Sequence, residues 1–73
     1  MDRLPIISGK EAVAAFSKVG FVVRRQKGSH IILRRDEPFA QIVVPNHRTL
    51  DRGTLHSIIR GAGLTTDQFN ELL

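Results

Sequence analysis

The residues best suited to chemistry in this sequence form one short segment, Arg24-Arg25-Gln26-Lys27-Gly28-Ser29-His30. Histidine is the side chain that most readily exchanges a proton near neutral pH, so His30 is a candidate general base. The three cations before it can stabilise negative charge that develops during a reaction. The Gly28-Ser29 pair leaves room for a ligand backbone to approach closely. A histidine beside a turn is more often an ordinary surface residue, and the segment alone leaves that interpretation open.

This combination suits RNA, because RNA carries its own nucleophile, the ribose 2′-hydroxyl. His30 would remove the hydroxyl proton, and the cations would align the adjacent phosphate and stabilise its added charge. We therefore predict that His30 is catalytic. The residues predicted to bind RNA are Arg24, Arg25, Gln26, Lys27, Gly28 and Ser29.

The other histidines are weaker candidates for a direct role. His47 follows Pro45-Asn46, and we retain it as a possible secondary site residue together with Arg52. His56 directly follows a predicted core residue and is expected at the surface. The spacing of the three histidines matches no metal-ligand pattern, and the chain has no cysteine. We expect neither a metal nor another cofactor.

Positive charge is concentrated in the middle of the chain. The formal net charge is +4, but residues 18–60 hold nine basic and three acidic residues, a net charge of +6. Such clustering favours a polyanionic partner, although solvated strand edges would carry similar charges. Trp and Tyr are absent, so base stacking has little support and recognition should depend on phosphates and shape.

The pattern of apolar residues predicts the elements that position this segment. A helix over about 8–19 has capping-box spacing at Ser8 and Glu11. Short connections join strands over 21–26, 30–35 and 39–44, which predicts an antiparallel meander. A second helix follows residues 49–54 and closes at Gly61 and Gly63. A short last helix begins with the capping-box spacing of Thr65 and Gln68 and carries Phe69, Leu72 and Leu73. The fold class is therefore α+β, α-β-β-β-α-α, a three-stranded antiparallel sheet with helices on one face.

Strand alternation predicts which side chains face the helices. The residues expected to point inward are Phe21, Val23, Ile31, Leu33, Ile42 and Val44. The residues expected on the open face are Val22, Arg24, Gln26, His30, Ile32 and Arg34. His30 should then lie beside Gln26, Lys27 and Arg24, unless a slip of one residue reverses the register.

Three segments in this order closely resemble the HicA (YcfA-like) toxin family. They are Arg25-Gln26-Lys27-Gly28-Ser29-His30, Val44-Pro45-Asn46-His47, and the run from Arg52-Gly53-Thr54-Leu55-His56-Ser57 to Ile58-Ile59-Arg60-Gly61-Ala62-Gly63-Leu64. The resemblance covers residues 8–73. Residues 34–39 depart from the turn common in the family, and residues 1–7 form an extension to which we assign no role.

The resemblance implies a fold like that of double-stranded-RNA-binding domains and the activity of an mRNA interferase, the endoribonuclease toxin of a type II toxin–antitoxin system. It implies that His30, which follows the Gly-Ser of the first hairpin, is the catalytic residue. It also implies a HicB-like antitoxin that covers the His30 hairpin.

Other interpretations remain open from the sequence. The chain could be a non-catalytic RNA-binding module of the same fold, or a subunit whose basic face meets an acidic protein. Its length predicts a single domain over residues 1–73. The absence of cysteine, of a signal peptide and of a long apolar run leads us to expect a cytoplasmic protein with no membrane partner.

Overall fold

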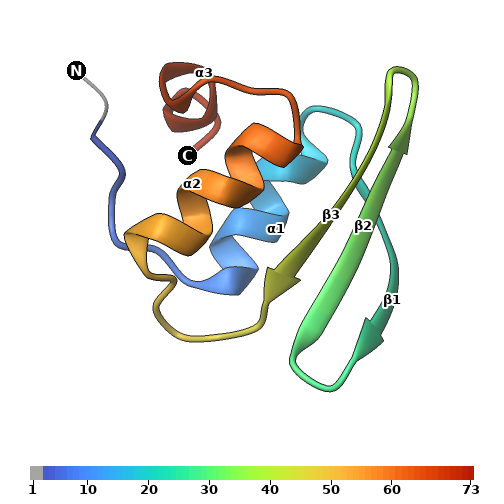
Figure 1. The fold of residues 1–73 in the computed structure, drawn as a ribbon, viewed down its shortest axis with the longest axis horizontal. Coiled ribbons are helices and arrows are strands. Elements are labelled where there is room, and N and C mark those ends of the chain that lie inside the picture. Colours follow the sequence, from blue (N-terminus) through green and yellow to red (C-terminus); the bar gives the residue numbers. More distant parts are fainter. Residues whose placement is uncertain (1–2) are drawn as a thin grey trace.

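The structure, a computed structural model, describes residues 3–73, and its elements follow the predicted order. Helix α1 spans Gly9–Ser17 and is followed by strands β1 (Val22–Lys27), β2 (His30–Asp36) and β3 (Phe39–Pro45). Helices α2 (Arg52–Gly61) and α3 (Thr66–Asn70) complete the chain. Figure 1 shows an antiparallel sheet in the order β1-β2-β3 with the helices packed on one side, which confirms the predicted fold class.

Both predicted capping boxes are formed. The Ser8 hydroxyl accepts a hydrogen bond from the Glu11 N–H at 3.1 Å, and the Glu11 carboxylate accepts one from the Ser8 N–H at 2.9 Å. Thr65 and Gln68 make the same pair of bonds at the start of α3. These bonds satisfy backbone donors that a helix start leaves free, and so they fix where α1 and α3 begin. Helices α1 and α3 are shorter than predicted, because residues 18–20 form a turn after α1 and α3 ends at Asn70, before Leu72.

The core lies between the sheet and the helices. Four of its members are the predicted inward residues Ile31, Leu33, Ile42 and Val44 of β2 and β3. Phe16 of α1 is fully buried, and its ring centroid lies 5.8 Å from that of Phe21. Fully burying a large apolar side chain contributes about 1.5–3 kcal/mol. Packing of this kind holds β2 and β3 firmly against α1 and α2.

Strand β1 departs from the predicted pattern. Phe21 is buried as expected, but Val23 is 46% exposed although it was predicted to point into the core. Val23 does pair with the core residue Leu33, so it lies on the helix side of the sheet. However, β1 is an edge strand that packs mainly on β2, and all six of its residues are exposed. The predicted face of Val23 is confirmed, but its side chain stays exposed, because alternation fixes the face of a side chain and not what covers it.

The N-terminal segment is part of the folded structure from Arg3 onward. Ile7 is buried, and its carbonyl accepts a hydrogen bond from the Leu50 N–H at 2.9 Å. The Arg3 carbonyl accepts one from the Asn70 side-chain amide at 2.6 Å. Residues 3–7 therefore connect α3 to the segment before α2, whereas Met1 and Asp2 of the predicted extension lie outside the described residues. Within residues 3–73, no helix has the length and apolarity needed to cross a bilayer.

Candidate nucleic-acid interface

His30 is the first residue of β2 and stands opposite Lys27 at the end of the β1–β2 hairpin. The two-residue turn between them has Gly28 at a φ of +60°, a conformation that favours glycine at the first position of a tight hairpin turn. The Gln26 side-chain amide donates to the Gly28 carbonyl at 3.0 Å and braces the turn. No atom lies within 4 Å of the position that a Gly28 side chain would occupy. The hairpin end is thus a defined, open surface with His30 and Lys27 side by side.

A β-bulge changes which residues share the face of His30. Val23 pairs with Leu33 and Arg25 pairs with Ile32, so β1 has one residue, Arg24, in excess at this point. Beyond the bulge the phase of β1 is reversed. Arg25 and Lys27 therefore lie on the open face with Ile32 and His30, because directly paired residues share a face.

The bulge corrects the predicted position of Gln26. We expected Gln26 on the open face beside His30, but it pairs with the buried Ile31 and lies on the opposite face. Arg24 lies with Arg25 opposite Ile32 rather than next to His30. The predicted alternation fails here because it assumes one residue for one residue across the strands.

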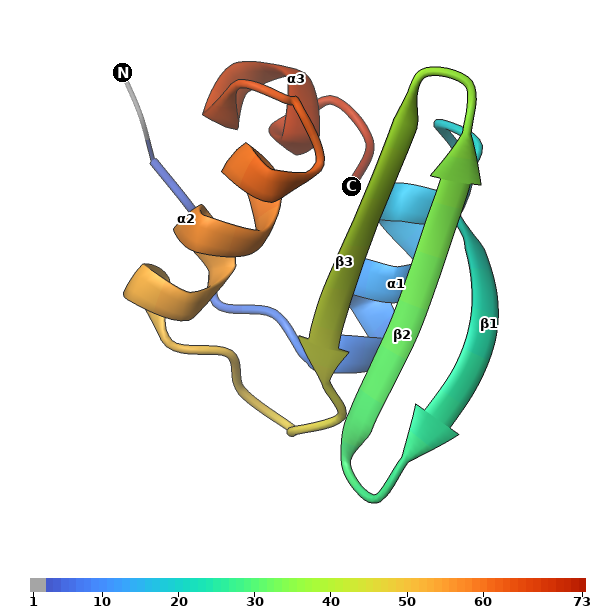
Figure 2. The same cartoon turned by 45° about the vertical axis from the view of Figure 1, so that its right-hand side comes forward.

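The connection from β3 to α2 begins on the side of His30 opposite to Lys27. His30 pairs across β2 and β3 with Pro45, and the Asn46 N–H donates to the Ser29 carbonyl at 2.6 Å. The His47 carbonyl accepts from the Gly9 N–H at 2.8 Å, so this connection also holds the start of α1. Figures 1 and 2 show the β1–β2 turn, this connection and the start of α1 at the same end of the molecule.

That junction forms an open cavity at the surface that sequence reasoning missed. It has a volume of about 260 Å³ and is lined by Ser8, Lys10, Asn46, His47 and Arg48. The side chains of Lys10, His47 and Arg48 are exposed. Nothing local in the sequence associates Lys10 with His47, because the two are brought together only when α1 packs against the end of β3.

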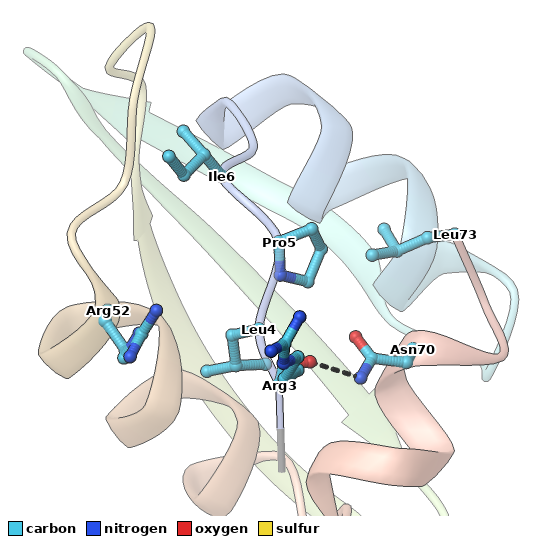
Figure 3. A pocket seen from close by; sticks show the side chains of 7 residues that line it. All are labelled: Arg3, Leu4, Pro5, Ile6, Arg52, Asn70 and Leu73. Carbon is cyan, nitrogen blue, oxygen red and sulfur yellow. Dashed lines mark hydrogen bonds between the residues drawn. The ribbon is translucent and has the colours of Figure 1, made fainter. Parts of the chain in front are cut away.

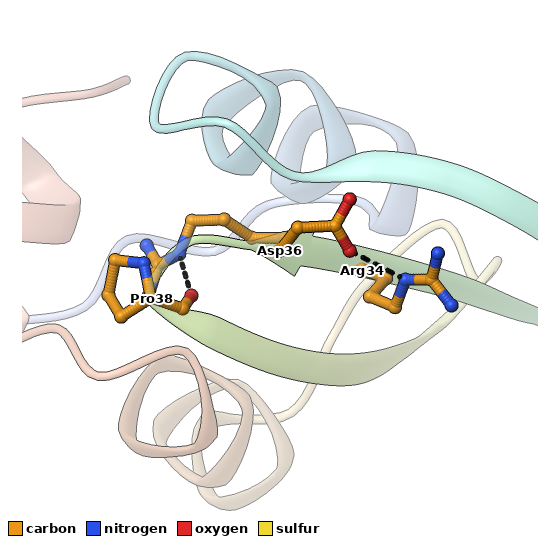
Figure 4. Close-up of polar contacts among 4 residues, drawn as sticks. Arg34, Asp36 and Pro38 are labelled. Carbon is orange, nitrogen blue, oxygen red and sulfur yellow. Dashed lines mark hydrogen bonds and ion pairs between the residues drawn. The ribbon is translucent and has the colours of Figure 1, made fainter.

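Two arginines of the basic span have structural contacts. Arg34 forms an ion pair with Asp36 at 3.0 Å, as Figure 4 shows. Arg35 donates from Nε to the Pro38 carbonyl at 2.9 Å and from Nη2 to the Ala62 carbonyl at 3.2 Å. Its guanidinium also lies 4.6 Å from the centroid of the Phe21 ring. The hydrogen bonds of Arg35 join the β2–β3 turn to the end of α2. This turn lies at the end of the sheet opposite to His30.

The cations around His30 have no such contacts. Within residues 3–73, no ion pair or side-chain hydrogen bond engages Lys10, Arg24, Arg25, Lys27 or Arg48. All five side chains are exposed. A solvated cation without a protein partner is free to contact phosphate, so the positive charge available to a ligand gathers near the hairpin.

Arg52, the other possible secondary residue, lies elsewhere. It is the first residue of α2 and lines a cavity of about 780 Å³ with residues of the N-terminal segment and of the C-terminal region, as Figure 3 shows. Those residues are Arg3, Leu4, Pro5, Ile6, Asn70 and Leu73. The structure thus groups Arg52 with the two ends of the described chain. His56 is exposed, as predicted.

Asp51 is the N-cap residue of α2, and hydrogen bonds at this helix start lower the pKa of its carboxyl group. Its carboxylate accepts hydrogen bonds from the Thr54 N–H at 2.8 Å and the Thr54 hydroxyl at 2.9 Å. These two bonds stabilise the ionised form and lower the pKa of Asp51 below its ordinary value, with a smaller contribution from the Gly53 N–H.

Comparison with known protein families identifies the family of this chain. A family model described as the HicA toxin of bacterial toxin–antitoxin systems matches residues 9–64, which include every residue of the hairpin and of the cavity lining except Ser8. No curated protein matches the chain.

Proposed function

Because the chain belongs to the HicA family of toxins from bacterial toxin–antitoxin systems, we propose that it is an endoribonuclease that cleaves mRNA with His30 as general base. The observation that carries this proposal is the position of His30. His30 is exposed at the start of β2, directly opposite Lys27. The turn before it is held by the bond from the Asn46 N–H to the Ser29 carbonyl and by the bond from the Gln26 side chain to the Gly28 carbonyl. This arrangement supports the proposal, because the hairpin backbone brings the side chains of His30 and Lys27 next to each other on an open surface.

The proposed reaction needs only groups that the RNA and this hairpin supply. His30 accepts the proton of a ribose 2′-hydroxyl, and the 2′-oxygen forms a bond to the adjacent phosphorus. The bond from phosphorus to the 5′-oxygen of the next nucleotide breaks, and that oxygen takes up a proton from water, while protonated His30 gives its proton back to the solvent. Lys27 and Arg25 stabilise the charge on the phosphate oxygens. The products are a 2′,3′-cyclic phosphate and a 5′-hydroxyl.

The decisive experiment removes the nucleophile. RNA with a 2′-O-methyl group at the cleaved nucleotide should bind but remain intact, whereas its unmodified counterpart is cut. Both reactions should be run in EDTA, because within residues 3–73 no group of three His, Asp or Glu side chains is placed to hold a metal ion. Cleavage of the methylated RNA would reject the mechanism. Binding of both RNAs without cleavage of either would favour a non-catalytic RNA-binding module.

Membership of the family implies an antitoxin partner. We propose that this partner is a HicB-like protein that covers the His30 hairpin. The open face of the sheet supports this, because Val43 is 44% exposed and shares that face with Ile32, Arg25 and Lys27 near His30. Apolar side chains interleaved with cations suit an acidic protein surface. Co-expression with the adjacent reading frame should yield a complex that no longer cleaves RNA, and an active complex would contradict the blocking geometry.

A further inference from the structure

The cavity lined by Ser8, Lys10, Asn46, His47 and Arg48 lies beside the hairpin but outside the proposed catalytic residues. We propose that it binds one phosphate group of the RNA strand, a few nucleotides from the bond that is cleaved at His30. This proposal rests on the proposed function, since it extends the same RNA strand from the hairpin to a second subsite.

Backbone contacts fix the cavity relative to His30. Pro45 stands opposite His30 in the sheet, and the Asn46 N–H is bonded to the Ser29 carbonyl. Paired strand residues lie about 5.5 Å apart between Cα atoms, and each further residue adds at most about 3.8 Å. The Cα atoms of His30 and His47 are therefore within about 13 Å of each other. A single RNA strand covers that distance in a few nucleotides.

Contacts with α1 close the other side of the cavity. The Gly9 N–H donates to the His47 carbonyl, and Gly9 is packed so closely on Pro45 and Asn46 that a side chain would collide with their backbone. Lys10 is the next residue of α1, so its position is fixed relative to Arg48. The subsite is thus built by two segments, the start of α1 and the connection from β3 to α2, and does not depend on the start of α1 alone.

The lining has the chemistry of a phosphate site. Lys10 and Arg48 are exposed cations without a protein partner among residues 3–73, and His47 adds a third nitrogen donor group. The guanidinium group of arginine can donate two parallel hydrogen bonds to two phosphate oxygens, and the ammonium group of lysine acts as a point charge. Glu11, the carboxylate nearest to Lys10 in sequence, instead bonds the Ser8 N–H and lines a different cavity.

The composition of the lining favours RNA over an acidic protein. All five lining residues are polar or charged, whereas the centre of a protein–protein interface is enriched in apolar and aromatic residues. Protein–nucleic acid contacts are dominated by phosphate and sugar groups, which charged and hydroxyl side chains bind.

The test measures binding of a fully 2′-O-methylated RNA at several salt concentrations, so that cleavage does not interfere. The logarithm of the association constant falls with the logarithm of salt concentration, so the slope is negative. In the double variant Lys10→Gln/Arg48→Gln, the magnitude of this slope should decrease by about 0.7, the value for one phosphate of a single strand. Each single variant should produce only a small part of this change, because the remaining cation still neutralises the same phosphate. Lys18→Gln/Arg60→Gln removes the same charges elsewhere and should leave the slope unchanged.

Each outcome decides one proposal. An unchanged slope in the Lys10/Arg48 variant, or an equal fall in the control variant, would overturn the subsite. An unchanged slope with weakened antitoxin binding would identify an acidic protein side chain as the occupant instead. If the slope falls as expected but unmodified RNA is never cleaved by the wild-type chain, the subsite stands and the proposed catalytic function is wrong.

Discussion

The Asn46 N–H donates a hydrogen bond of 2.6 Å to the carbonyl of Ser29, and this contact joins two connections that are far apart in sequence. Ser29 belongs to the turn that carries His30, and Asn46 begins the segment that leads to α2. Because Gly9 bonds the carbonyl of His47, the start of α1 is held by the same segment. The candidate base is therefore fixed by β1, β3 and α1 together.

The close approach of α1 to this segment predicts an unusual effect of alanine. Gly9→Ala should destabilise the protein by about 1–3 kcal/mol, because the new methyl group would collide with the Pro45 carbonyl. Gly53→Ala is the matched control, since it also lies in the first turn of a helix but has only an ordinary contact of 3.5 Å with Asp51. There the higher helix propensity of alanine should add up to about 1 kcal/mol. Denaturant unfolding of both variants measures the difference, and equal effects would contradict the close packing.

Replacing His30 separates catalysis from folding. His30→Gln should lower the rate of RNA cleavage by about 10²–10⁴-fold, which is the usual contribution of a general base. Its stability should change by about 0.5 kcal/mol or less, because the side chain is exposed. His56→Gln, an exposed histidine on α2, serves as control and should cleave at the wild-type rate. Single-turnover cleavage and thermal melts test this, and an active His30→Gln protein would remove His30 from the mechanism.

The β-bulge predicts that neighbouring residues of β1 differ in their effect on RNA binding. Arg25→Gln should reduce the slope of log K against log salt by about 0.7, because Arg25 lies on the face of His30. Gln26→Ala should leave that slope unchanged, because Gln26 carries no charge and pairs with Ile31 on the opposite face. If Arg25→Gln has no effect on the slope, the RNA does not cross the open face at this position.

The lowered pKa of Asp51 predicts that the protein loses part of its free energy of unfolding in acid. Since its folded pKa lies below the ordinary value of about 3.9, its contribution is complete above that value and is lost as the pH falls through the folded pKa. Asp51→Asn keeps an acceptor for the Thr54 N–H but cannot ionise. The wild-type protein should therefore be the more stable at pH 7, and the difference in free energy of unfolding should shrink at pH 3. A difference independent of pH would contradict this assignment.

Much of the fold follows from local rules. Ser8 with Glu11 and Thr65 with Gln68 predicted two helix starts, because capping bonds span only three residues. The Gly28-Ser29 pair predicted the hairpin, because glycine readily takes the positive φ of its turn. Three segments, which begin at Arg25, Val44 and Arg52, likewise predicted the family that the match over residues 9–64 confirms. Each capping box, the turn and each segment is encoded within a short run of consecutive residues.

Tertiary structure decided which residues meet at the site. The bulge at Arg24 moved Gln26 to the other face, since an extra residue in a strand depends on how its partner pairs and leaves no periodic mark in the sequence. Val23 kept its predicted face but lies at an edge that the helices leave largely uncovered. Lys10 and Arg48 are 38 positions apart, and they line one cavity because α1 packs against the end of β3. The sequence by itself determined the elements and the candidate base, whereas long-range packing determined the surroundings of that base.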